Sequence, residues 1–178
     1  MDINEGGKKT MNETDLRMIE TMLKEQKELI SDTMKEFGLT TIGDEQLSQA
    51  LLCEVGEFIS ETKQDWCWWM KNPPAVDESK KIGELVDIWS LVLTDVAINR
   101  HGLLPSRLSW IDECIDVEKN FYRDCGLTRG LAELASYRSL RLEKIIALSE
   151  LLGYSLEQIY TEYMKKNKVN RERLGSGY

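Results

Sequence analysis

The chain has 178 residues, of which 42% are hydrophobic, and it carries a formal net charge of −8 at pH 7 with an isoelectric point near 4.9. This is enough to bury one substantial core, and no change of composition along the chain calls for a second domain. The acidic balance argues against direct nucleic-acid binding, because a phosphate backbone requires clustered lysine and arginine. With no signal peptide, no apolar run long enough to span a bilayer and no C-x-x-C spacing, we expect a cytoplasmic protein with reduced thiols that binds no membrane.

The first two predicted helices occupy the N-terminal third of the chain. From Asp15 to Phe37, apolar residues recur mostly at every third or fourth position and Gly38 supplies a stop, so we predict a first helix there. A second helix is predicted to begin near Asp44, whose side chain can cap it. It should run to a tryptophan cluster and end before Asn72-Pro73-Pro74, which cannot continue a helix.

The rest of the chain also has the pattern of helices. A third helix is predicted from about Asp77 to Arg100, and apolar residues cover most of its circumference, so we expect it to be buried. Further helices follow, with stops predicted at Gly126 and Gly153, and Ser155-x-x-Gln158 forms a capping box for a last helix through Tyr163. No window alternates at the period of two that strands require. The predicted fold class is therefore all-α, a bundle of about six helices.

Two acidic pairs lie on the second and third predicted helices, Glu54-x-x-Glu57 and Glu84-x-x-Asp87. A spacing of three places both carboxylates of a pair on one helix face, here at the border of the apolar stripe. Ionised carboxylates in apolar surroundings are costly unless they are paired or bind a metal, and no basic residue stands three or four positions from Glu54, Glu57 or Asp87. Oxygen ligands of this kind suit Mg²⁺ or Mn²⁺. The alternative is that both pairs are solvated surface acids.

Two further segments could hold a phosphorylated ligand. Three of the five tryptophans fall in residues 65–69, just before Lys71, where an indole could stack on a nucleobase or pack into the core instead. The C-terminal segment is the only concentrated basic one. Lys166 and Arg173 are candidate donors to phosphate oxygens, with Asn170 on the same helical face as Lys166; a solvated basic tail is the alternative.

These residues resemble the all-α nucleoside triphosphate pyrophosphatases related to MazG and, within them, the dimeric dUTPase family. In that family E-x-x-E on one helix and E-x-x-D on the next bind Mg²⁺. The resemblance therefore implies that Glu54, Glu57, Glu84 and Asp87 hold two or more Mg²⁺ ions, with Mn²⁺ as a possible substitute, and Glu54 is the catalytic candidate that orients or deprotonates a water.

The resemblance also covers the residues expected to bind the nucleotide. The closing pattern K-N-x-x-N-x-x-R-x-x-x-G-Y and the Trp-rich segment followed by Lys-Asn both match the family, as does a glutamine on the first helix. The implied substrate-binding residues are Gln26, Trp68, Trp69, Lys71, Lys166, Asn167, Asn170, Arg173 and Tyr178. One departure concerns base recognition, because Ser90-Leu91 stands where the family usually has His-Phe.

The expected domains are a flexible segment over 1–12, an all-α pyrophosphatase domain over 13–166 and a substrate-binding tail over 167–178. The resemblance implies Mg²⁺-dependent hydrolysis of dUTP to the monophosphate and pyrophosphate by a homodimer, in the host cytosol if the protein is phage-encoded. Two alternatives stay open. One is a dCTP or broader deoxynucleotide pyrophosphatase, and the other is a non-enzymatic helical module that binds a regulator through residues 103–153.

Overall fold

The computed structural model describes residues 11–98, 110–136 and 141–176, and every regular element in these ranges is a helix, as predicted. Seven of the helices have ten residues or more, close to the predicted six. They are α1 (Glu13–Glu36), α2 (Asp44–Glu61), the four-residue α3 (Lys63–Trp66), α4 (Glu78–Ile98), α6 (Ile111–Cys125), α7 (Leu127–Ser136), α8 (Arg141–Leu151) and α9 (Leu156–Gly175). No helix in the described ranges is both long and apolar enough to cross a membrane.

Several predicted helix ends are confirmed. The Ser155 and Gln158 side chains form the predicted capping box at the start of α9. Gly38, Gly126 and Gly153, the three predicted stops, have φ values of 63°, 85° and 86°, a backbone conformation that glycine adopts readily and other residues rarely do.

Two predicted boundaries were wrong, and one further boundary was missed. The second helix ends at Glu61 rather than at the tryptophan cluster, because Thr62 bonds back to the Ile59 carbonyl through both its N–H and its hydroxyl group. Between the predicted stops at Gly126 and Gly153 lie two helices, α7 and α8, and the boundary between them was not predicted. The last helix continues past Tyr163 to Gly175, so most of the predicted 167–178 tail is the second half of α9. Of the segment predicted to be flexible, residues 1–10 lie outside the described ranges.

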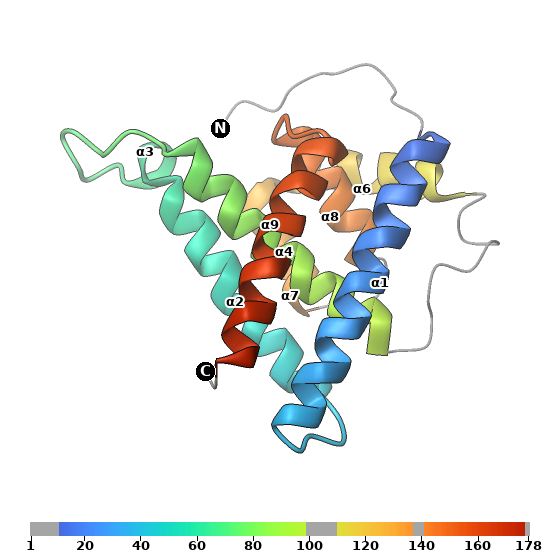
Figure 1. Cartoon of the computed structure of the whole chain (residues 1–178). Helices are drawn as coiled ribbons and strands as arrows, with labels where there is room; N and C mark the ends of the chain where they lie inside the picture. Colours follow the sequence, from blue (N-terminus) through green and yellow to red (C-terminus); the bar gives the residue numbers. More distant parts are fainter. Residues whose placement is uncertain (1–10, 99–109, 137–140, 177–178) are drawn as a thin grey trace.

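Helix α4 lies at the centre of the packing and contacts α1, α2, α8 and α9 (Figure 1). It was predicted to be buried, and ten of its residues are, including Trp89 with no exposed surface. Helix α9 packs along α1, while α6, α7 and α8 pack on one another as a second group. The acidic pairs lie on α2 and α4, in the region where α1, α2, α4 and α9 come together.

Candidate active site

Glu54, Glu84 and Asp87 converge where α2 packs against α4. One carboxylate oxygen from each lies within 4.8 Å of those of the other two, and all three side chains are half-buried. This arrangement brings together members of both predicted acidic pairs. Glu57 belongs to the same helix face but is exposed and is not part of this closest group.

The pKa values of the three carboxyls show that the cluster holds negative charge at a cost. Burial raises the pKa of Glu54 to about 7, and the charges of Asp87, Glu57 and Glu84 contribute to the rise. Burial is also the largest cause of the raised pKa of Glu84 and of Asp87. A bound divalent cation would relieve both the desolvation and the repulsion, so the donor set fits Mg²⁺ or Mn²⁺.

A cation from a distant part of the chain partly neutralises the cluster. The Lys166 ammonium group, on α9, pairs with the Asp87 carboxylate and donates to the Gly83 carbonyl oxygen at 3.3 Å. The pKa of Asp87 is raised nevertheless, because desolvation outweighs the hydrogen bond and the charge of Lys166. The fold therefore brings Lys166 to the carboxylate cluster, and its role as a phosphate donor stays a prediction.

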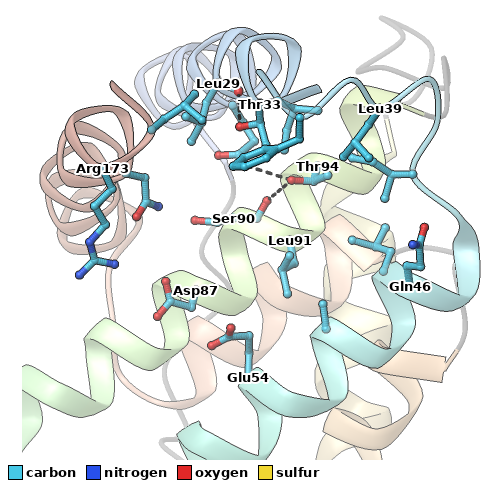
Figure 2. A pocket seen from close by; sticks show the side chains of 18 of the residues that line it. Leu29, Thr33, Leu39, Gln46, Glu54, Asp87, Ser90, Leu91, Thr94 and Arg173 are labelled. Carbon is cyan, nitrogen blue, oxygen red and sulfur yellow. Dashed lines mark hydrogen bonds between the residues drawn. The ribbon is translucent and has the colours of Figure 1, made fainter. Parts of the chain in front are cut away.

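The carboxylate cluster opens into a pocket of about 550 Å³ between α1, α2, α4 and α9. Glu54 and Asp87 lie at one end, Thr33 and Leu39 at the other, and Ser90 lies between them (Figure 2). Its lining combines an apolar wall with a few polar groups, which is typical of small-molecule sites. The polar residues at its wall other than the two acids are Gln26, Thr33, Thr41, Gln46, Ser90, Thr94, Asn170 and Arg173.

Three of the predicted substrate-binding residues line this pocket, namely Gln26, Asn170 and Arg173. Asn167 does not. It is 4% exposed, donates to the Tyr163 hydroxyl at 3.2 Å and accepts from Arg171 Nε at 2.9 Å. Its amide therefore supports the pocket wall from behind. Tyr178 lies outside the described residues.

The tryptophan segment lies apart from the pocket wall. Trp68 is 87% exposed and Trp69 is 61% exposed, and the Trp69 ring contacts the rings of Trp66 and Trp68 edge to face. Lys71 is exposed as well. The indoles of Trp68 and Trp69 are thus not packed into the core, but within a single chain none of Trp68, Trp69 or Lys71 lines the pocket.

Sequence reasoning missed several residues that shape the site. Thr94 is 2% exposed within the apolar surface of α4, and Tyr163 is fully buried on α9. Their signal was a polar group on an otherwise apolar face. Thr33 and Gln46 gave no such signal, because the pocket wall they form depends on how α1 and α2 meet.

Comparison with known protein families gives one match. A family model described as dUTPase matches residues 18–178. Comparisons with curated proteins and with solved structures find no match.

Proposed function

The chain belongs to the dUTPase family, whose model spans residues 18–178, and from this membership we propose that it hydrolyses dUTP to dUMP and pyrophosphate with the help of Mg²⁺. The observation that carries the proposal is the group of three carboxylates, within 4.8 Å of one another, at the end of a pocket of about 550 Å³. A nucleoside would lie against the mixed apolar and polar wall, with its triphosphate extending toward the acids.

Glu54, Glu84 and Asp87 would hold the metal, and the exposed Glu57 would join them or bind a further ion. When bound, Mg²⁺ would neutralise charge on the triphosphate and make a nearby water more acidic. Lys166, already at Asp87, and Arg173, at the pocket wall, would donate hydrogen bonds to phosphate oxygens. Mn²⁺ would suit the same oxygen donors.

The chain's own groups supply the proton chemistry. Glu54 is the proposed general base, because its half-buried carboxyl group lies at the end of the pocket toward which the triphosphate would extend. It would take one proton from water as the water oxygen attacks the α-phosphorus. The bond from that phosphorus to the oxygen bridging it to the β-phosphorus breaks, so the products are dUMP and pyrophosphate.

Base preference is the finer part of the proposal. Ser90 and Leu91, which replace the family's usual His-Phe, both line the pocket, so the departure falls where a nucleoside would lie (Figure 2). A preference for dCTP, or for deoxynucleotides in general, is the second candidate for this reason. The homodimer rests on the family resemblance and remains a proposal, as does the cytoplasmic location.

The test is pyrophosphate release from dUTP, dCTP, the other deoxynucleotides and UTP, with Mg²⁺ and with EDTA. We expect Mg²⁺-dependent release that is fastest with dUTP. A different preferred nucleotide would keep the chemistry and change the specificity. Release from no nucleotide would overturn the enzymatic proposal and favour a binding module.

Two amide variants test the assigned roles. Glu54→Gln and Asp87→Asn should each lower turnover at least about a hundredfold, the lower end of what a general base contributes. Glu45→Gln is the matched control, because Glu45 is an exposed residue at the start of the same helix as Glu54. It should turn over like the wild type. Normal turnover by Glu54→Gln would contradict the assignment.

A further inference from the structure

We propose that Tyr163, which does not line the pocket, is a positioning residue that fixes the amide of Gln26 with its N–H toward the pocket, and so makes the site prefer a uracil carbonyl to a cytosine amino group. This inference rests on the proposed function, because it concerns the base of the same nucleotide. It does not concern the metal site.

The Gln26 side chain is held at both ends. It is 4% exposed and still reaches the pocket wall. Its Nε2 donates to Thr94 Oγ1 at 2.9 Å, and its Oε1 accepts from the Tyr163 hydroxyl at 2.8 Å. Because Tyr163 is fully buried and Gln26 is nearly so, water does not compete for the hydrogen bond between them.

These bonds belong to a longer chain of hydrogen bonds that runs in one direction. Arg171 Nε donates to Asn167 Oδ1 at 2.9 Å, and Asn167 Nδ2 donates to the Tyr163 hydroxyl at 3.2 Å. Beyond Gln26, the Thr94 hydroxyl donates to the Ser90 carbonyl at 2.8 Å (Figure 2). The chain begins at a guanidinium group, which can only donate, and ends at a backbone carbonyl, which can only accept. Its direction is therefore set at both ends.

That direction decides which way the Gln26 amide points. In a flipped amide, Oε1 would face Thr94 Oγ1, whose single hydrogen is already directed to the Ser90 carbonyl, and two acceptors would oppose each other. The Tyr163 hydrogen has two acceptors in reach, Gln26 Oε1 at 2.8 Å and the Met22 carbonyl at 3.1 Å, and the shorter contact is the one to Gln26. Without the Tyr163 hydroxyl, one of the two constraints on the amide is lost.

The consequence concerns the ligand. Nε2 carries two hydrogens, of which Thr94 takes one, so the second is the group that Gln26 can offer to a molecule in the pocket. Uracil presents a carbonyl oxygen at position 4, whereas cytosine presents an amino donor there. A fixed donor pairs with the first and opposes the second. A ligand that leaves a buried polar group of the site without a hydrogen bond binds more weakly, and this difference makes the site selective. The chain would in this way read the base although it lacks the family's His-Phe.

The experiment compares Tyr163→Phe with the matched control Tyr160→Phe, a partly buried tyrosine of the same helix. Calorimetry gives the dissociation constants of dUMP and dCMP for each protein, and kcat and KM for dUTP and dCTP are measured alongside. We expect the wild type and Tyr160→Phe to prefer dUMP. Tyr163→Phe should lose about tenfold of that preference, the equivalent of one hydrogen bond, with its kcat for dUTP within about twofold of wild type.

A second variant keeps the test decisive if Tyr163→Phe does not fold. Gln26→Glu has the same shape but offers acceptor oxygens, so it should shift the preference toward dCMP. An unchanged dUMP to dCMP ratio in the variants that fold would overturn the proposal, and so would a wild type without base preference. Because dUMP binding needs no turnover, a protein that binds dUMP selectively but releases no pyrophosphate would refute the enzymatic function and leave this inference supported.

Discussion

At the scale of a single residue, Glu54 both lines the pocket and has a carboxyl pKa close to neutral pH. Its pKa of about 7 follows from burial first and from three neighbouring carboxylates second. A protonated carboxyl group cannot ligate a metal as well as a carboxylate does, so protons and Mg²⁺ compete for Glu54.

This competition predicts the pH dependence of metal binding. Below pH 7 Glu54 holds its proton and above pH 7 it loses it, so Mg²⁺ affinity should rise about tenfold between pH 6 and pH 8. Calorimetric titration of the metal-free protein with Mg²⁺ at both pH values measures it. In Glu54→Gln the rise should be much smaller, whereas Glu45→Gln should behave like the wild type. An equal rise in Glu54→Gln would show that another group titrates.

Alanine substitutions at two glycines should have opposite effects on stability. A Cβ atom added at Gly56 in α2 would meet nothing within 4 Å, so this glycine is not needed for close helix packing. A Cβ atom at Gly130 in α7 would lie 1.8 Å from the Tyr122 ring. In urea unfolding, Gly56→Ala should raise the free energy of unfolding by up to about 1 kcal/mol. Gly130→Ala should lower it by about 1–3 kcal/mol. A destabilised Gly56→Ala would mean that space at Gly56 is used.

At the scale of an element, α9 owes its place to Arg171. Its guanidinium group lies 3.0 Å from Glu25, 3.5 Å from Glu28 and 3.7 Å from Asp32, all on α1. This contact holds the second half of α9 along α1 and so keeps Asn170 and Arg173 at the pocket wall. The first half of α9 is attached through the core residues Leu156, Ile159 and Tyr163, but no hydrophobic residue of α9 after Met164 belongs to the core or packs against it. The attachment of the second half therefore depends on such pairs.

Arg171→Met should therefore loosen α9 without unfolding the protein. We expect faster amide hydrogen exchange in the second half of α9 and a loss of about 1.5–3 kcal/mol in the free energy of unfolding, the range for hydrogen bonds to charged groups. Lys165→Met is the control, because Lys165 is on the same helix but pairs only within it, with Glu162 at 2.9 Å. Exchange in α9 that stays at the wild-type rate would show that apolar contacts hold the helix.

The same helix shows where sequence reasoning reaches its limit. The start of α9 was predictable because the Ser155 and Gln158 capping box is a local pattern. Its end was not, because the residues after Tyr163 are polar and their order depends on acids of α1, more than a hundred positions away along the chain. The stops at Gly126 and Gly153 were likewise local and were found.

At the scale of the whole molecule, the local features of the site were also predictable from sequence, and its long-range contacts were not. The pairing of Glu54 with Glu84 and Asp87 was predictable, since spacing sets each helix face and successive apolar helices tend to pack together. The contacts that complete the site join residues far apart in sequence, 79 positions for Lys166 and Asp87 and 137 for Tyr163 and Gln26. No periodicity encodes such distances, so the counter-ion of the carboxylates and the support of Gln26 required the structure.

One buried residue joins the helices that carry the site to those that do not. Arg141, at the start of α8, is 2% exposed and lies 3.2 Å from the Asp95 carboxylate of α4. It also donates to the carbonyl groups of Leu134 and Ala135 at the end of α7 and to Ser48 of α2, at 3.0, 2.9 and 3.2 Å. Four helices thus meet at one guanidinium group.

Removing this group should destabilise the whole molecule. Arg141→Met leaves the Asp95 charge buried without this partner, and breaking a buried pair in this way costs about 3–5 kcal/mol. Adding Asp95→Leu removes this buried charge as well, so the double variant should recover part of that loss. Urea unfolding followed by circular dichroism and by tryptophan fluorescence measures both. Because Trp89 lies in the core of α4, coincident transitions would show that the two groups of helices unfold together, and separate transitions would show that Arg141 does not couple them.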